Sequence, residues 1–305
     1  MRIVSLLPSA TEIVAALGLG RALVGRTHEC DFPAWVSEVP AVTADRLECA
    51  PLDSAGIDRA VSEAVSTEGL YRLDERALAA ARPDLIVTQA LCGVCAVEVD
   101  RVREAAERLP GRPQVLSLEP ETIEDVLESI VTVGAAAGAH RAAERLRARL
   151  AERIAAVAAR AAGRPRPRVT CLEWLDPPFA AGHWVPEQVA LAGGHDPLGR
   201  PGRPSVRIAP AQVVEADPEL LVLMPCGWSA DQAAAALDPA AFAGAYGATR
   251  AVRDGRVVAV DASAYFSRPG PRLVDGAELL AALIHPEADG PYPAGAARWL
   301  VPAAA

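Results

Sequence analysis

Short apolar runs alternate with amphipathic stretches along most of the chain. Apolar runs bounded by turn residues predict buried strands, and they occur at 2–6, 23–26, 84–88, 114–118, 168–173, 219–224 and 256–260. Segments with helical spacing lie between them, at 8–18, 73–81, 97–109, 187–191, 210–216 and 273–284. Strands that alternate with helices imply parallel sheets covered on both faces. The pattern therefore predicts an α/β fold built from two Rossmann-like lobes.

A long helical stretch, 122–163, separates two halves that show the same pattern. Its second part, 139–162, contains no Gly or Pro, and four apolar residues recur there on one helical face, namely Leu146, Leu150, Ile154 and Val157. Gly134 and Gly138 indicate a break into a short helix and a long one. An ordinary surface helix is the alternative, but the repeated pattern on either side favours a rigid strut between two lobes.

This pattern gives a division of the chain into four parts. We expect an N-terminal α/β lobe at 1–120, a linking helix at 121–163, a C-terminal α/β lobe at 164–288 and a Pro- and Ala-rich tail at 289–305. A chain of 305 residues is long enough for two domains. We expect a ligand cleft between the lobes.

The charge pattern excludes some classes of partner. The net charge is −9, and the 30 basic residues are all Arg and form no dense run, which argues against nucleic acid and against an anionic membrane surface. No apolar run approaches the roughly 18 residues of a transmembrane helix. The apolar run at 3–7 ends at Pro8 and is too short for a secretory signal. With six Cys, which suit a reducing compartment, this predicts a cytoplasmic location, or an extracytoplasmic one if a leader was removed.

Reactive and aromatic residues gather after the predicted strands. In open α/β sheets, ligands bind at the carboxyl ends of the strands. The residues found there are His28, Glu29 and Cys30, then Gln89, Cys92 and Cys95, then Trp174, Phe179, His183 and Trp184, then Cys226 and Trp228, and last Tyr265 and Arg268. A single Cys or Trp is most often a core residue, but the concentration at corresponding places favours a functional site.

Three kinds of chemistry fit the sulfur and imidazole groups. Thiolates and imidazoles suit zinc, an iron–sulfur cluster or cobalt in a macrocycle, and the candidate ligands are Cys30, Cys92, Cys95, Cys226, His28 and His183. A Cys-x-x-Cys pair between a strand and a helix also suits redox chemistry. The third alternative is a cysteine nucleophile with a His base.

Several segments carry a resemblance to a known family. The opening 3–12, I-V-S-L-L-P-S-A-T-E, resembles that of the periplasmic binding proteins that serve cobalamin and iron-siderophore importers, and 82–87, R-P-D-L-I-V, is similar to a strand of that family. Segments 176–179, 192–194 and 266–272 fit as well. The match runs from residue 3 to about 285, and the order and spacing of the motifs are its specific part.

The resemblance implies binding rather than catalysis. It implies two α/β lobes joined by one long helix, Tyr265 as a ligand-facing aromatic, and Trp174, Phe179 and Trp184 in a loop of the cleft. A corrin is a broad, partly apolar plate that aromatic walls fit. We therefore expect a non-catalytic protein that binds cobalamin or a related metal tetrapyrrole, with ligand contacts from Glu29, Gln89, Trp174, Phe179, Trp184, Trp228, Tyr265 and Arg268.

The alternatives are a cytosolic metal or iron–sulfur protein that uses the Cys and His residues, and a cysteine-dependent enzyme. The resemblance also implies an ABC transporter permease as partner. Family members present one carboxylate on each lobe to that partner, for which Glu75 is the N-terminal candidate, whereas 210–212 offers no carboxylate.

Overall fold

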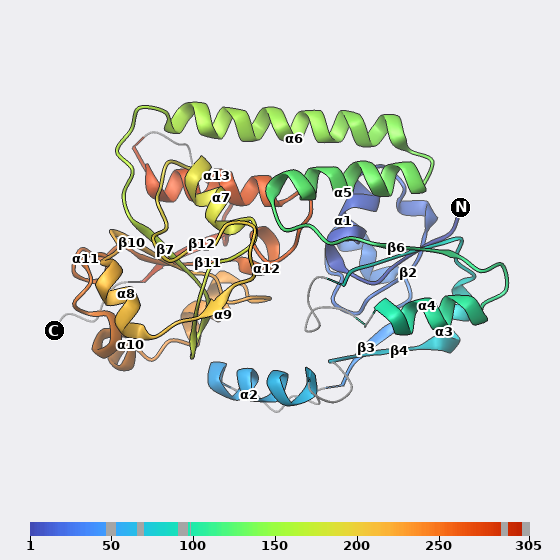
Figure 1. Cartoon of the computed structure of the whole chain (residues 1–305), viewed down its shortest axis with the longest axis horizontal. Coiled ribbons are helices and arrows are strands. Elements are labelled where there is room, and N and C mark those ends of the chain that lie inside the picture. The colour runs from blue at the N-terminus through green and yellow to red at the C-terminus, as the bar shows by residue number, and fades with distance from the viewer. Residues whose placement is uncertain (47–52, 66–69, 91–96, 98, 288–291, 301–305) are drawn as a thin grey trace. The chain divides into compact units, whose positions relative to one another are not determined.

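A computed structural model of the chain describes residues 1–46, 53–65, 70–90, 97, 99–287 and 292–300. The chain forms two compact units (Figure 1). We call them the N-terminal lobe, made of Met1–Leu52, Gly56–Pro120 and Glu124–Leu150, and the C-terminal lobe, made of Asp53–Ala55, Glu121–Ile123 and Ala151–Ala305. The predicted two-lobed α/β fold is confirmed.

The N-terminal lobe is built on a parallel sheet of apolar strands. Its strand order is β2-β1-β5-β6, with β1 Ile3–Ser5, β2 Leu23–Arg26, β5 Leu85–Thr88 and β6 Gln114–Ser117. All residues of β1 and β5 are buried, as expected for strands that are covered on both faces. These four strands are those that the apolar runs predicted.

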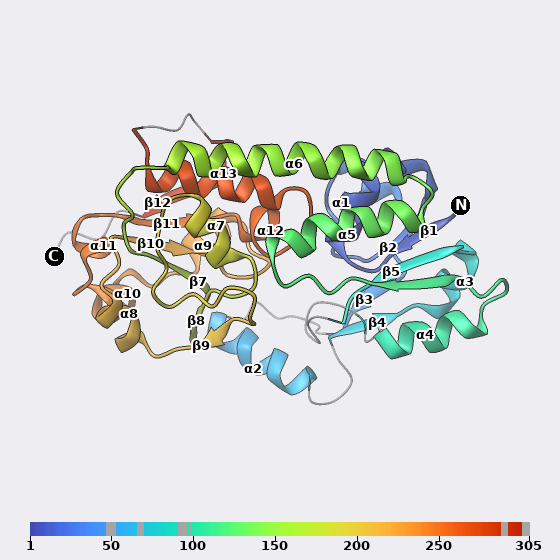
Figure 2. The same ribbon diagram turned by 45° about the horizontal axis from the view of Figure 1, so that its top comes forward.

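Helices cover both faces of this sheet. Figures 1 and 2 show α1 and α5 on one face and α3 and α4 on the other; their bounds are α1 Pro8–Ala16, α3 Glu75–Ala81, α4 Val99–Arg108 and α5 Ile123–Ala136. On the α3 and α4 side, Leu78 and Val102 pack with Val4 and Ile86 of the sheet. Two short 3-10 turns, Gly20–Ala22 and Ala34–Glu38, complete the lobe before the ribbon described next.

An antiparallel ribbon interrupts the regular alternation of the N-terminal lobe. It pairs β3 (Thr43–Asp45) with β4 (Tyr71–Leu73), and helix α2 (Ser54–Val65) lies between the two strands in the sequence. The hydrophobic pattern over 34–70 is weak, so none of these elements was predicted.

The C-terminal lobe has a mixed sheet with the order β12-β11-β10-β7-β8-β9. The three central strands are parallel and were predicted; they are β7 Val169–Leu175, β10 Leu220–Leu223 and β11 Val257–Val260. Antiparallel strands extend both edges, and none of the three was predicted: β8 Pro178–Ala180, β9 Val206–Arg207 and β12 Ala297–Leu300. Because β12 lies in the predicted tail, part of that tail belongs to the sheet.

The helices of the C-terminal lobe again lie on two faces. Figure 1 shows α7 and α13 on one side and α8 to α11 on the other, with bounds α7 Val185–Leu191, α8 Pro210–Ala216, α9 Ala230–Ala235, α10 Pro239–Tyr246, α11 Arg250–Arg253 and α13 Leu273–Ile284. A single turn of helix, α12 (Ala262–Tyr265), follows β11. The sequence predicted α7, α8 and α13 and missed the short Ala-rich helices.

The long helical stretch consists of α5 and α6 (His140–Ala161). Gly138 ends α5 with a φ of +71°, a conformation that favours glycine. Gly134 has a different role, because a Cβ there would lie 2.3 Å from the Cβ of Ala143, so the glycine allows α6 to approach α5 closely. Of the four residues predicted to share one face of α6, Leu146, Leu150 and Val157 are buried and Ile154 is half-buried. Among the helices that the structure describes, none has the length and hydropathy to cross a bilayer.

Candidate ligand-binding site

His28, at the carboxyl end of β2, is held by a chain of hydroxyl groups. Its Nδ1 lies 2.7 Å from Oγ1 of Thr43, and the Thr43 hydroxyl donates to Oγ1 of Thr27 at 2.9 Å. Because that hydroxyl has a single proton, His28 Nδ1 is the donor to Thr43, so a neutral His28 carries its lone pair on Nε2. The ring also packs edge-on against Tyr71, with the centroids 4.9 Å apart.

Glu29 lies beside this imidazole. Its Oε1 is 3.4 Å from His28 Nε2, and its side chain is 46% exposed. The predicted pair His28 and Glu29 is therefore brought together at one strand end of the N-terminal lobe. An imidazole fixed by a second group in this way is preorganised either for an ion pair or as a ligand.

The other predicted residues of this lobe are buried or lie outside the described residues. Gln89, just after β5, is 7% exposed, and Cys30 is 4% exposed, with its Sγ 3.0 Å from Oγ1 of Thr11. Cys92 and Cys95 lie outside the residues that the structure describes.

Aromatic rings form a row at the carboxyl edge of the C-terminal sheet. The rings of Trp228 and Trp174 meet edge to face, with centroids 5.3 Å apart. Trp174 stands opposite Phe179 in the β7–β8 pairing, and the guanidinium of Arg207 lies over the Phe179 ring at 5.7 Å. We call these four residues the aromatic row.

The strand pairing explains why the row shares one face. Phe179 is paired with Arg207 across β8 and β9, and residues directly opposite on antiparallel strands point to the same side of a sheet. The register of β7 shifts between Leu172 and Trp174, which changes the side-chain alternation where the row begins. The three aromatic residues are half-buried, so each offers part of a ring to solvent.

Residues from the start of α2 lie against this row. Trp174 donates from Nε1 to the carbonyl of Ser54 at 3.1 Å, and the amide of Asp176 donates to Ser54 Oγ at 3.1 Å. Neither Ser54 nor Arg207 was found from the sequence, because Ser54 lies in a weakly patterned segment and β9 has two residues.

Trp184 is buried in the interior of the C-terminal lobe. It is 5% exposed and donates from Nε1 to the carbonyl of Phe266 at 2.8 Å. His183 stacks on it at 5.5 Å and adopts a φ of +48°, which is uncommon outside glycine. Its Nδ1 is buried and makes no hydrogen bond to the part of the chain that the structure describes, and burial lowers the pKa of the imidazole.

Tyr265 and Arg268 follow β11. Asp261 caps α12 through a bond from the amide of Ala264 at 2.8 Å, which fixes the turn that carries Tyr265. Both predicted residues are half-buried. Burial, followed by the negative charge of Asp261, raises the pKa of the Tyr265 phenol, so this group is a neutral hydrogen-bonding partner at neutral pH.

Glu173, a half-buried residue at the end of β7, supports the loop beside the row. Glu173 Oε1 accepts from the amide of Gly182 at 2.9 Å, and burial raises the pKa of Glu173 to about 8. The exposed Cys226 connects to the same residue, since its amide donates to the Glu173 carbonyl at 3.0 Å. Glu173 therefore anchors the strand end to the loop that begins at Gly182.

The metal site predicted from Cys and His is not assembled among the described residues. No group of three or more His, Cys, Asp and Glu side chains within 1–46, 53–65, 70–90, 97, 99–287 and 292–300 is arranged to hold a metal ion. Two of the predicted thiols fall outside these ranges, so this set stays a prediction.

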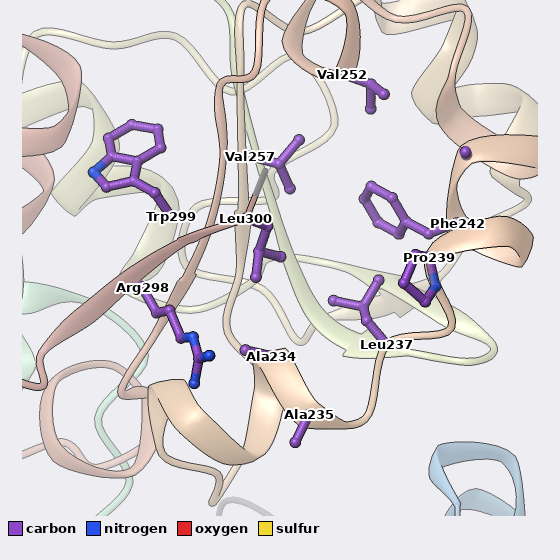
Figure 3. Close-up of a pocket in the computed structure, with 11 residues that line it drawn as sticks. Ala234, Ala235, Leu237, Pro239, Phe242, Val252, Val257, Arg298, Trp299 and Leu300 are labelled. Atoms are coloured by element: carbon purple, nitrogen blue, oxygen red, sulfur yellow. The ribbon is translucent and has the colours of Figure 1, made fainter. Parts of the chain in front are cut away.

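A cavity of about 390 Å³ lies elsewhere in the C-terminal lobe (Figure 3). Its walls come mainly from α9, α10, α11, β11 and β12 and are mostly apolar, including Leu237, Phe242, Val257 and Leu300, with Arg298 among the lining residues. None of the residues predicted for the site lines it.

Comparison with known proteins places the chain in a family. Residues 3–264 match the family described as periplasmic binding proteins, so the chain belongs to this family and has the fold of a substrate-binding protein. No curated protein matches the sequence.

Solved structures share this fold at low sequence identity. A periplasmic heme-binding protein from Pseudomonas aeruginosa is 22% identical with a TM-score of 0.71, and the match covers 94% of each chain. The periplasmic vitamin B12 binding protein BtuF of Vibrio cholerae is 19% identical with a TM-score of 0.68, covering 93% of this chain and 96% of that one. The heme-binding protein RhuT from Roseiflexus sp. RS-1 is 22% identical with a TM-score of 0.70, covering 94% and 99%.

These findings correct the predicted location. The cytoplasmic assignment is wrong, because the family and the similar structures are periplasmic binding proteins, which points to a place outside the cytoplasm. The assignment followed from the short apolar run before Pro8 and from the number of Cys, and neither feature reports where a folded protein works.

Proposed function

We propose that this member of the periplasmic binding protein family binds a metal tetrapyrrole, with cobalamin as the first candidate and heme as its rival. The aromatic row of the C-terminal lobe is the observation that carries the proposal. Trp228, Trp174 and Phe179 present partly exposed rings side by side, and a flat, largely apolar macrocycle is the kind of ligand that such rings bind.

The polar edge of the N-terminal lobe supports the same ligand class. His28, fixed through Nδ1 by Thr43, has the form of an imidazole that can serve as a metal ligand through Nε2. The side chain of Glu29, at 3.4 Å, would have to move for Nε2 to reach a metal. We propose that Glu29, Gln89, Tyr265 and Arg268 add polar contacts to the periphery of the macrocycle.

Family membership also supports the two candidate ligands. The similar structures include a vitamin B12 binding protein and heme-binding proteins. Their identity to this chain is low, so they favour a ligand class without choosing between corrin and porphyrin. As in the family at large, we propose that the protein passes its ligand to an ABC transporter permease, with Glu75 at the start of α3 as one contact. The Glu75 side chain is 61% exposed and pairs with Arg108 at 2.9 Å.

Absorption spectroscopy tests the ligand directly. Purified protein is mixed with hydroxocobalamin or hemin in parallel, and binding is expected to shift the visible bands and to keep the pigment with the protein through gel filtration. A His28→Ala variant is expected to change the spectrum of the complex if the imidazole ligates the metal. If the protein retains neither pigment at micromolar concentration, the proposed ligand class is refuted.

A further inference from the structure

The α2 segment makes contacts that neither the sequence pattern nor the family explains. In the sequence it lies between the two strands of the β3–β4 ribbon, whose end is closed by a bond from the Arg46 amide to the Leu70 carbonyl at 2.9 Å. That ribbon belongs to the N-terminal lobe, yet Asp53–Ala55 at the start of α2 belongs to the C-terminal lobe. The chain thus leaves one compact unit and returns to it within this insertion.

Ser54 anchors the start of α2 through three hydrogen bonds. Its carbonyl accepts from Trp174 Nε1 at 3.1 Å, its Oγ accepts from the Asp176 amide at 3.1 Å, and its hydroxyl reaches the Asp176 carbonyl at 3.3 Å. Ser54 is 8% exposed. Trp174 and Asp176 lie at the end of β7, where the β7–β8 hairpin turns, so α2 is fastened to the hairpin that carries the aromatic row.

The β3–β4 ribbon contacts another predicted ligand residue, His28. Thr43 on β3 hydrogen-bonds to His28, and Tyr71 on β4 packs against the same imidazole. The two strands that flank α2 in the sequence therefore hold His28 in place.

Helix α2 is expected to need contacts with the rest of the chain for its order. It has 12 residues, and isolated helices of that length are marginal in water. Undocking would therefore melt the helix as well as release the hairpin, so docked and undocked forms are two discrete states of the kind that a ligand can select.

We propose that α2 is a strap whose docking on Trp174 is coupled to occupation of the aromatic row. Trp174 belongs to both: its ring stands in the row, and its N–H holds Ser54. A macrocycle stacked on the ring fixes the indole in one rotamer, so the strap then binds a donor that is already ordered. Coupling is reciprocal, so the docked strap must in turn raise the affinity for the ligand. This second half rests on the proposed function, whereas docking itself does not.

Limited trypsin digestion tests docking without any ligand. The chain has no Lys, and Arg59 is an exposed cleavage site within α2. Ser54→Ala removes two of the three bonds and Trp174→Phe removes the other, and each is expected to raise cleavage after Arg59 about tenfold, as ordinary hydrogen bonds imply. Ser62→Ala is the matched control, since Ser62 Oγ donates within the helix, to the Asp58 carbonyl at 2.8 Å.

A reference site separates undocking from loss of the fold. Arg149 is an exposed residue of α6, and a variant that unfolds globally would be cleaved faster at both positions. The expected result is a rise at Arg59 relative to Arg149. If the ratio is the same in wild type, Ser54→Ala and Ser62→Ala, docking does not order α2 and the strap is refuted.

Digestion with hemin or hydroxocobalamin tests the coupling. The pigment that binds is expected to slow wild-type cleavage at Arg59 about tenfold and to bind Ser54→Ala more weakly than wild type. An unchanged cleavage rate with bound pigment would overturn the coupling. Failure of both pigments to bind would count against the proposed function and against the coupling that rests on it. The digestion of the ligand-free protein would still decide whether α2 is docked.

Discussion

The carboxyl edges of the two sheets carry different chemistry. In the N-terminal lobe the edge is polar, and His28 is fixed by the hydroxyl groups of Thr43 and Thr27. In the C-terminal lobe the edge is aromatic, and Trp174 and Trp228 meet edge to face. One lobe thus offers an oriented imidazole with a carboxylate beside it, and the other offers a wall of rings.

The difference follows from how each sheet is extended. Each strand of the N-terminal sheet described above is parallel to its neighbours, so its edge residues come from loops. The C-terminal sheet adds the antiparallel strands β8 and β9, which bring Phe179 and Arg207 onto the face that holds Trp174. Side chains on strands are held more rigidly than those on loops. We therefore expect the aromatic row to provide most of the free energy of ligand binding.

Removing a ring of the row should have the largest effect. Trp174→Ala and Phe179→Ala are each expected to weaken pigment binding by about 3 kcal/mol, roughly a hundredfold, because aromatic anchors dominate such interfaces. Isothermal titration with hydroxocobalamin and hemin measures the loss. Trp299→Ala is the control, since Trp299 is a 39% exposed indole on β12, outside the row. Equal losses of pigment affinity in Trp299→Ala and Trp174→Ala would show that the aromatic row has no special role in binding.

The buried carboxyl of Glu173 should make the C-terminal lobe sensitive to pH. Burial raises its pKa from 4.5 to about 8, so the folded protein keeps a proton that the unfolded chain releases between these values. The resulting stabilisation is complete below about pH 4.5 and is lost as the pH rises to about 8, by on the order of 3 kcal/mol. Asp196, whose pKa burial raises to about 6, adds a loss of the same sign at lower pH.

Urea unfolding at pH 5 and pH 8 measures this slope. Intrinsic fluorescence reports mainly on the C-terminal lobe, which holds all Trp residues except Trp35. Glu173→Gln, which stays neutral, is expected to flatten the dependence, whereas Glu75→Gln at an exposed position should leave it as in wild type. A steep slope that persists in Glu173→Gln would assign the effect to another group.

The polar edge should respond to loss of a single hydroxyl. Thr43→Val has nearly the same shape but leaves the His28 Nδ1 without its partner, so the free energy of unfolding is expected to fall by about 2 kcal/mol. Thr132→Val is the matched control, because the Thr132 hydroxyl donates to the Glu128 carbonyl of its own helix, α5, in an exposed hydrogen bond. The comparison uses urea titrations of both variants; similar midpoints would show that the hydroxyl chain does not order this edge.

The sequence predicted the strands in which every residue is buried. The runs at 84–88 and 219–224 became β5 and β10, since a strand covered on both faces must be apolar throughout. It missed β8, β9 and β12, because short edge strands need few apolar residues and carry no clear alternation. The Ala-rich helices α9 and α10 were missed for a related reason: Ala favours a helix without marking a buried face.

The candidate site residues that the sequence suggested are those whose side chains carry a distinctive chemistry. Trp174, Phe179 and Trp228 were proposed because aromatic residues are rare here and follow predicted strands, and the structure places the three near one another. Trp184 has the same sequence signal, but it is buried against Phe266, and no periodicity distinguishes a core indole from an exposed one. Arg207 and Ser54 depend on pairings between segments far apart in the chain, which a single sequence does not reveal.

The smallest predicted effect concerns which macrocycle the row prefers. Hemin carries two carboxylates, whereas the corrin of cobalamin is surrounded by amides, so an exposed cation beside the row should favour hemin. Arg207, over the Phe179 ring at 5.7 Å, is that cation. Arg207→Gln is expected to weaken hemin binding three- to fivefold, about 1 kcal/mol, as for exposed ion pairs, and to leave hydroxocobalamin within twofold. The effect of Arg207→Gln on hemin binding should shrink in high salt, because exposed charges are screened. The control is Arg203→Gln, at an exposed position in the preceding loop, which should change the affinity for neither pigment. Equal losses for both pigments would mean that Arg207 acts by supporting Phe179 rather than by its charge, and selectivity would then have to come from the polar edge around His28.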